Sequence, residues 1–439
     1  MTHACEIELV QRDPKLLEEL YQKARQAGWS GAFAAEITQR HDASPENPLL
    51  AAWHYRLTAP ASVTGQERAA DQARRINWRL AIPLSLALAL VYVILMNERF
   101  DLASGPTYIV LAWAPLAACL IMTFLTLAGR WPRQRLWIIL GVAAVTAYVS
   151  WMVVSRFTNA PLRDLMSLHL PVMAWAAVGL CILGRRLDDR DRFGFLIKSV
   201  EVILTGGIFF GAALVFIGIT TGLFAAIGVS LGDPLMRSLF SGAAGLIPVL
   251  AVATVYDPEV SPGSQRFDQG LPRLISTLGR IFLPLTLIVA VIYVLSIPAN
   301  FAKPFEQRDV LVVYNAMLFA VMGLIVIATP VNGDELSSGL RTWLRRGLIT
   351  LAVLTVLVSV YALSATVYRT MLGGLTMNRL TIIGWNTINI ALLCFYLYGQ
   401  IRGGLDRWVA SSQAAFRVGM VAYAAWTLFL LLAVPLVFG

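Results

Sequence analysis

Eleven hydrophobic runs, each long enough to cross a lipid bilayer, constrain this chain more than any other feature of its sequence. A run of about 20 residues in helical form spans the hydrocarbon core of a bilayer, and the runs here have about 17 to 25 residues each. Because a backbone in hydrocarbon must satisfy its own hydrogen bonds, the runs predict an all-α fold, a polytopic transmembrane helix bundle of about eleven spans. The runs lie at residues 80–96, 107–128, 136–154, 165–183, 199–222, 238–256, 281–297, 310–329, 347–367, 380–399 and 415–438.

The composition excludes a soluble globular class. Hydrophobic residues make up 57% of the chain and charged residues only 14%, whereas soluble domains carry roughly a quarter charged residues. The net charge of +9 does not indicate a nucleic-acid partner, because the arginines lie in short loops beside the hydrophobic runs. At that position basic residues meet anionic lipid and determine topology. The bilayer is therefore the predicted partner.

The sequence offers little that would support catalysis or metal binding. Three of the four cysteines lie inside hydrophobic runs without CxxC spacing, so neither a disulfide framework nor a zinc site is indicated. Motifs of metalloproteases, serine hydrolases, P-loop enzymes and dinucleotide-binding folds are absent. Asp188, Asp189 and Asp191 alternate with arginines, which is typical of a self-neutralising loop. We predict no cofactor and no enzymatic activity.

Residues 1–76 form a polar, cytoplasmic segment before the first hydrophobic run, with a predicted linker at 59–76. Residues 77–439 form the predicted membrane domain. Asp13 and Pro14 are a helix start signal, Ser30 can begin a second helix that ends near Arg40, and 49–57 can form a third. A helical module of this size is marginal alone. We expect it to pack on the membrane domain or to bind a cytoplasmic protein, and the sequence leaves the oligomeric state open.

The distribution of basic residues predicts the sidedness. Gaps after even-numbered runs contain 16 Lys and Arg, and gaps after odd-numbered runs contain 8. Since basic residues are retained in the cytoplasm, we expect the N-terminus inside and the C-terminus outside. The stretch 199–231 is longer than one span requires. If 222–231 crossed or re-entered the membrane, every later loop would change side, an alternative that the charge count opposes.

The fifth run carries two GxxxG patterns that place four glycines within about 60° of one helical face. Such a face allows another helix to approach closely, which predicts a helix-packing seam; the alternative is a gating hinge or a permeation face. Ser241 and Gly245 offer a shorter seam in the next run. The four glycines are Gly207, Gly211, Gly218 and Gly222.

Polar residues inside the runs are candidate functional residues, because burying them in hydrocarbon is unfavourable. His169 lies two residues before Pro171 and can be a neutral, hydrogen-bonded histidine between packed helices. Glu201 lies three residues from Lys198 and can pair with it. Asn386 and Asn389 are expected to face the interior, with Asn315 as one possible partner. These asparagines have two interpretations: they form hydrogen bonds between helices, or they line a polar cavity that binds a small solute.

Part of the second half resembles a known family. The stretch LPRLISTLGRIFLPLTLIVAVIYVLSI (271–297), and a Y-R-x4-G-L-T-x-N-R loop that leads into IIGWNTINI, resemble a bacterial family of polytopic membrane proteins of unknown function, the DUF-4153 group. The resemblance covers about 80–400 and implies a bacterial inner membrane protein without indicating a substrate. In that loop Arg369, Asn378 and Arg379 are candidate contacts for an anionic headgroup or solute; the alternative is that the arginines pair with Asn378 and backbone carbonyls.

Three functional hypotheses follow from these features. Many spans, short loops, a glycine face and interior asparagines favour a transporter-like or permease-like bundle. The alternative is a non-transporting scaffold or sensor that engages a cytoplasmic partner through residues 1–76. A membrane-embedded enzyme that acts on lipid ranks last, because no acid or nucleophile constellation is present.

Overall fold

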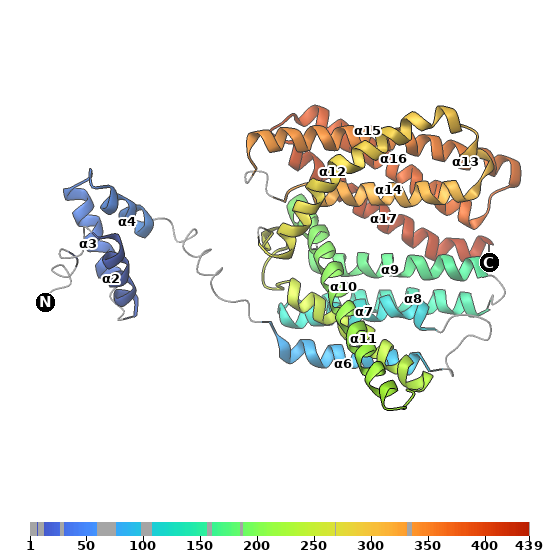
Figure 1. Ribbon diagram of the computed structural model, residues 1–439, viewed down its shortest axis with the longest axis horizontal. Coiled ribbons are helices and arrows are strands. Elements are labelled where there is room, and N and C mark those ends of the chain that lie inside the picture. Colours follow the sequence, from blue (N-terminus) through green and yellow to red (C-terminus); the bar gives the residue numbers. More distant parts are fainter. Residues whose placement is uncertain are drawn as a thin grey trace. The chain divides into compact units, whose positions relative to one another are not determined.

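The computed structural model describes residues 7, 13–26, 30–58, 76–97, 108–155, 160–184, 188–267, 269–331 and 336–438, and these residues contain helices and turns but no strand. The predicted all-α fold is therefore confirmed for the described part of the chain (Figure 1). Contacts divide the chain into two units, Met1–Arg75 and Ile76–Gly439. The predicted linker before the first span falls outside the described residues, apart from Ile76.

The first unit contains α2 (Pro14–Gln26), α3 (Ser30–Ala43) and α4 (Pro48–Thr58). Asp13 caps α2, because its carboxylate accepts hydrogen bonds from the backbone N–H of Lys15 at 2.9 Å and of Leu16 at 3.3 Å. Asn47 caps α4 in the same way through its side-chain oxygen. The three helices that the sequence predicted are thus present, and each starts at the capping signal or within a residue or two of it.

Aromatic side chains form the core of this first unit. The rings of Tyr21, Phe33 and Trp53 lie 5.3 to 5.8 Å apart between centroids, a favourable spacing for tilted and edge-on pairs. Arg56 lies over the Trp53 ring at 4.5 Å and pairs with Glu18 at 2.6 Å. The unit therefore has a hydrophobic core of its own.

The second unit contains the eleven spans that the sequence predicted, and each coincides with one hydrophobic run. The longest, α10, has 38 residues, which is about 57 Å of helix and far more than the hydrocarbon core requires. The spans are α6 (Trp78–Leu95), α7 (Ile109–Ala128), α8 (Trp137–Ser155), α9 (Ala160–Leu183), α10 (Asp189–Ala226), α11 (Asp233–Val255), α12 (Leu271–Ser296), α14 (Arg308–Ala328), α15 (Ser338–Gly373), α16 (Met377–Gly403) and α17 (Trp408–Phe438).

The stretch 222–231 makes no additional span. Its first residues belong to the end of α10, and the chain then turns between Ile227 and Gly232 before α11 begins. The number of spans therefore stays at eleven. We call the end of the unit where α6 begins the first end and the opposite end, where α17 finishes, the second end (Figure 1).

Helix α17 joins the two halves of the membrane unit. Figure 1 shows it between α9 on one side and α14 and α16 on the other. Near the first end, Trp408 and Phe416 belong to a buried cluster with residues of α14, α15 and α16. Near the second end, Leu430 and Leu431 belong to a cluster with α7, α8 and α9. A third cluster contains α6, α7 and α11.

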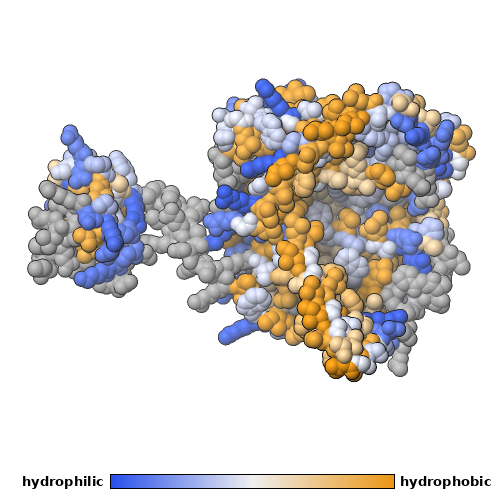
Figure 2. Space-filling view, viewed as in Figure 1, coloured by the Kyte–Doolittle hydropathy of each residue, from blue (hydrophilic) through white to orange (hydrophobic). Residues whose placement is uncertain are grey.

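Helix α10 is buried mainly at its start, and beyond Glu201 Ile217 is also buried. Phe193 is fully buried, and Gly263 of the loop after α11 donates its N–H to the Asp191 carboxylate at 2.9 Å. Beyond Glu201 the helix exposes large apolar side chains, and it runs obliquely across the other spans (Figure 1). Figure 2 shows this hydrophobic surface continuing over α12. Because such a surface is stable only in hydrocarbon, the chain is an integral membrane protein.

Helix α11 packs closely on α6 through Gly245. A Cβ atom at this position would lie only 2.5 Å from the Ala89 Cα atom, so the two backbones can meet only if residue 245 is glycine. Ser241, one turn earlier, is buried. The short seam that the sequence predicted at Ser241 and Gly245 is confirmed.

Candidate functional site

His169 and Trp385 connect α9 to α16 near the middle of the membrane unit. The His169 ring is buried, and its Nε2 atom accepts a hydrogen bond from the Trp385 indole N–H at 3.1 Å. Nδ1 lies 2.7 Å from the Leu165 carbonyl oxygen, one turn earlier in α9. Because Nε2 accepts, the proton of a neutral imidazole must be on Nδ1, where it is donated to that carbonyl. The geometry fits a neutral histidine.

Asn386 and Asn389 follow Trp385 on α16, and both side chains are buried. The Tyr423 hydroxyl of α17 donates to the Asn389 side-chain oxygen. The Nδ2 atoms of both asparagines have no hydrogen-bond partner among the described residues. An amide N–H buried without a partner costs about 1 to 3 kcal/mol, so these two groups are suited to bind something that the protein does not itself supply.

Close contacts between α16 and α17 hold these side chains at one level. A Cβ atom at Gly384 would lie 1.9 Å from the Trp426 ring, so the indole packs directly on the α16 backbone. The antiparallel register of the two helices then places Thr427 within a turn of Asn386. The Thr427 hydroxyl is buried and has no hydrogen-bond partner in the described part of the chain. We call His169, Trp385, Asn386, Asn389, Tyr423 and Thr427 the central polar patch.

Asn315 does not take part in this patch. Its amide N–H donates to the Leu311 carbonyl oxygen of its own helix, α14, at 2.9 Å. The prediction that Asn315 pairs with Asn386 or Asn389 is therefore wrong, since α14 meets α16 through Phe319, whose ring lies 5.6 Å from that of Trp385. The amide bends back to its own backbone, which satisfies it locally.

Glu201 forms a local ion pair away from the patch. The Lys198 ammonium lies 2.7 Å from the Glu201 carboxylate, and both side chains are buried near the start of α10. The Lys198 ammonium also lies 5.2 Å from the centroid of the Phe267 ring. This ion pair fits the interpretation, made from the sequence, that Glu201 pairs locally with Lys198.

A second polar cluster, which the sequence analysis missed, lies near the first end. The Gln400 amide N–H donates to the Ser412 hydroxyl at 2.9 Å and to the Trp408 carbonyl at 3.0 Å. The Arg345 guanidinium of α15 donates to the backbone carbonyl oxygen of Gln400 at 2.6 Å. The Tyr396 hydroxyl is buried one turn away. We call Arg345, Tyr396, Gln400, Trp408 and Ser412 the terminal polar patch.

Several polar atoms of the terminal polar patch also lack partners. Buried atoms without a hydrogen-bond partner among the described residues include Arg345 Nε, Gln400 Oε1 and Trp408 Nε1. The sequence carries a signal for part of this arrangement. Asn386, Asn389, Tyr396 and Gln400 fall within about 80° of one another around α16 at 100° per residue, and therefore form one buried polar stripe.

An apolar layer separates the two patches. Asn389 and Tyr396 are seven residues apart, which is about 10 Å along the helix. Between them, Leu393 of α16 and Phe416 of α17 line a small cavity of about 10 Å³, to which Tyr396 also contributes. This volume is close to the smallest that holds one water molecule. Leu392 packs against Gly419 at the same level. We call Leu392, Leu393 and Phe416 the apolar layer.

The glycine face of α10 has no close neighbour among the residues that the structure describes. A Cβ atom at Gly207, Gly211, Gly218 or Gly222 would meet no described atom within 4 Å. The four glycines therefore form no helix-packing seam with the described residues, and α10 meets α11 through other positions, such as Gly206 beside Ile247. A seam with another chain stays a prediction.

The arginines of the loop between α15 and α16 bind backbone carbonyls. Arg369 donates to the Glu306 carbonyl at 3.2 Å, and Arg379 donates to the Gly374 carbonyl at 2.5 Å. Among the described residues, the Asn378 side chain forms no hydrogen bond with either arginine. These contacts fit the interpretation of local pairing with carbonyls, and contact with an anionic headgroup or solute stays a prediction.

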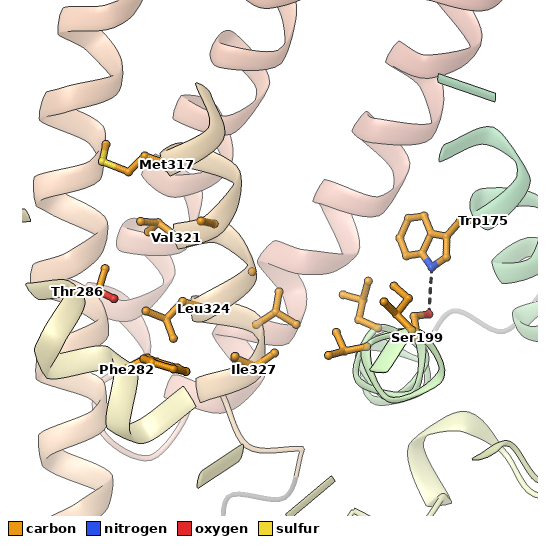
Figure 3. Close-up of a pocket in the computed structure, with 14 residues that line it drawn as sticks. Trp175, Ser199, Phe282, Thr286, Met317, Val321, Leu324 and Ile327 are labelled. Atoms are coloured by element: carbon orange, nitrogen blue, oxygen red, sulfur yellow. Dashed lines mark hydrogen bonds between the residues drawn. The ribbon is translucent and has the colours of Figure 1, made fainter. Parts of the chain in front are cut away.

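Two apolar grooves lie on either side of α10. One, of about 590 Å³, lies between α10 and the pair α12 and α14, and Figure 3 shows Trp175 donating its indole N–H to Ser199 beside it. The other, of about 550 Å³, lies between α10, α11 and the pair α6 and α7, and Phe210 contributes to its lining. Neither groove is lined by the central or the terminal polar patch.

Comparison with protein-family models, with curated proteins and with solved structures finds no match. The resemblance of residues 80–400 to the DUF-4153 group therefore stays a prediction. What the chain does has to be inferred from the geometry of the two polar patches and of the apolar layer between them.

Proposed function

We propose that the protein is a permease that moves a small polar solute along the seam between α16 and α17. The central polar patch would bind the solute, and the terminal polar patch would receive it near the first end. The apolar layer of Leu392, Leu393 and Phe416 would keep the two apart in the conformation described here.

The observation that supports the proposal is a set of unpartnered polar atoms in the membrane interior. Along the α16–α17 seam, the buried atoms that lack a partner among the described residues include Asn386 Nδ2, Asn389 Nδ2, Thr427 Oγ1 and Gln400 Oε1. Folded proteins leave few buried polar groups unsatisfied. A bilayer supplies no water to pair them, so a row of such groups on one helix face favours a path for a polar guest.

The apolar layer explains how a permease with this seam would avoid a permanent leak. A narrow hydrophobic constriction blocks a pore by excluding water from it, that is, by dewetting. Small shifts of α17 relative to α16 would open it, because Gly419 and Gly384 allow these helices to touch closely and slide. The solute would then pass between the patches only when the layer separates.

The charge distribution supports placing the first end in the cytoplasm. The loops at that end contain 16 of the basic residues between spans, against 8 at the second end. With this sidedness the terminal polar patch would lie on the cytoplasmic side and the C-terminus outside. The protein would then be a multi-pass protein of a bacterial inner membrane.

The test is solute entry into proteoliposomes that contain the purified protein, followed by light scattering after an osmotic step. Glycerol, erythritol, sorbitol and glycine serve as probes. We expect at least one of them to enter faster than into protein-free vesicles, and we expect N389L to abolish the difference. The matched control is N315L, since Asn315 bonds only to its own helix. Equal entry with and without protein for every probe would contradict the proposal.

The independent core of the first unit favours a second candidate function. Tyr21, Phe33 and Trp53 bury one another within residues 1–75, so this unit can present a defined surface to a cytoplasmic protein. A scaffold or sensor would depend on it. Deletion of residues 1–75 should leave solute entry unchanged if the chain is a permease, and should abolish cross-linking to a cytoplasmic protein in cells if it is a scaffold.

A further inference from the structure

A cavity of about 580 Å³ lies on the outer surface of α15 near the first end. Its polar lining includes Thr342, Arg346 and Thr350, and Trp343 and Gly347 complete the surface. These residues recur at spacings of three and four and therefore occupy neighbouring faces of one helix. The cavity belongs neither to the central nor to the terminal polar patch.

The outward face of α15 changes from polar to apolar side chains along its length. This change indicates how deep in the membrane the cavity lies. Arg346 and Thr350 are exposed, and the next outward positions, Val353, Leu357 and Val360, are exposed and apolar. The helix has 36 residues, about 54 Å, so it extends beyond a hydrocarbon core of about 30 Å. The boundary of the hydrocarbon therefore falls near Thr350, and the cavity lies at the depth of the lipid headgroups.

Positive charge gathers at this depth, and among the described residues it has no acidic partner. Arg341, Arg345 and Arg346 follow one another along α15, and none forms an ion pair with a described carboxylate. Arg341 and Arg345 donate to the backbone carbonyls of Asp406 and Gln400, whereas Arg346 lines the cavity. Helix α12 packs against α15 here, because Leu283 contacts Gly347, and α12 carries Arg280 one turn before Leu283. The Arg280 Nε atom is buried without a partner among the described residues. An anion would compensate this charge.

The donors around the cavity match a phosphate diester. Arg346 carries a guanidinium, which binds phosphate oxygens through two parallel hydrogen bonds. Thr350 lies one turn further and Trp343 one turn earlier, and neither the Thr350 hydroxyl nor the Trp343 indole N–H is engaged in a hydrogen bond with a described residue. Tryptophan is also the residue most typical of the membrane interface.

We propose that this cavity binds the headgroup of an anionic phospholipid, with its phosphate at Arg346 and Thr350 and an acyl chain along Val353, Leu357 and Val360. Basic pockets beside transmembrane helices recognise anionic headgroups by this chemistry. The bilayer itself supplies the occupant, and the apolar continuation of the same helix face supplies the acyl-chain contact. The proposal is independent of any transport activity.

The experiment is native mass spectrometry of the full-length protein in detergent, titrated with phosphatidylglycerol or with phosphatidylcholine of the same acyl chains. We expect tighter binding of phosphatidylglycerol, and we expect R346Q to weaken it about fivefold, the effect of one arginine at a membrane surface. T350V retains the charge and should weaken binding by a smaller factor. The matched control is R402Q, which removes an exposed arginine from the same end but outside the cavity.

Several outcomes would overturn the proposal. Equal binding of the two lipids would mean that the negative charge of the headgroup is not recognised. Equal weakening of phosphatidylglycerol binding by R346Q and R402Q would mean that only general surface charge acts. A third arm adds inorganic phosphate alone and follows thermal unfolding of the wild-type protein and of R346Q. Stabilisation by phosphate through Arg346, with no preference for phosphatidylglycerol, would assign the cavity to a free anion instead of a lipid. Retained helical circular dichroism in each variant excludes misfolding as the cause.

Discussion

The Trp385 indole N–H donates to His169 Nε2 across 3.1 Å, although the two residues are 216 positions apart in the sequence. Their rings are also stacked, with centroids 6.0 Å apart and an interplanar angle of 20°. This contact joins α9 to α16 at the level of the two buried asparagines. It therefore links the two halves of the membrane unit where the central polar patch lies.

The His169–Trp385 hydrogen bond should be measurable in a double-mutant cycle. H169F and W385F each remove one partner, and the double variant removes both. Interhelical hydrogen bonds in membranes contribute about 0.6 kcal/mol on average and up to about 1.7 kcal/mol, so we expect a coupling energy in that range. Thermal unfolding of the four proteins in detergent gives the value. Strictly additive single effects would show that the bond contributes nothing to stability.

Two glycine-to-alanine substitutions should have opposite effects. At Gly384 a Cβ atom would lie 1.9 Å from the Trp426 ring, so G384A must displace that indole and should destabilise the protein by about 1 to 3 kcal/mol. At Gly207 a Cβ atom meets nothing within 4 Å, so G207A should be neutral, or stabilising by up to about 1 kcal/mol through helix propensity.

The measurement for this pair is the midpoint of unfolding in detergent, with G207A as the matched control for the loss of a glycine in a span. A lower midpoint for G207A than for the wild type would indicate that its face packs against another chain in the purified protein. An unchanged midpoint for G384A would contradict the close packing of Trp426 on α16.

The apolar layer should determine the permeability of the seam. L393N places an amide between Asn389 and Tyr396, which would connect the two polar patches with hydrogen-bonding groups. Since a hydrophobic constriction excludes water, we expect L393N to increase proton entry into proteoliposomes at least severalfold over the wild type. A pH-sensitive dye inside the vesicles reports the rate. The control is L357N, which places the same amide on an exposed, lipid-facing position of α15; equal rates for both variants would argue against a barrier at Leu393.

The sidedness can be tested by cysteine labelling. Met371 near the second end is 82% exposed, and Arg407 lies in the exposed turn between α16 and α17 at the first end. In a variant whose four native cysteines are replaced by serine, a membrane-impermeant maleimide added to spheroplasts should label M371C but not R407C. Lysis should make R407C reactive. Labelling of R407C before lysis would reverse the assigned orientation.

The sequence alone determined the eleven spans and the three helices of the first unit. Hydrophobic length is a property of each segment by itself, and capping residues such as Asp13 act on the next turn, so neither depends on distant parts of the chain. The same reasoning placed Glu201 beside Lys198, because partners three residues apart on a helix are neighbours.

Only the tertiary structure decided which polar groups meet. Every span is apolar on nearly all faces, so hydrophobicity does not indicate which face turns inward, and helix association depends on packing and on interhelical hydrogen bonds. For this reason the sequence did not show that His169 accepts a hydrogen bond from Trp385 or that Asn315 bonds to its own helix. Nor did it show that the glycine face of α10 has no close neighbour among the described residues. The terminal polar patch likewise exists only because three helix ends meet there, a relation between distant segments that no local pattern encodes.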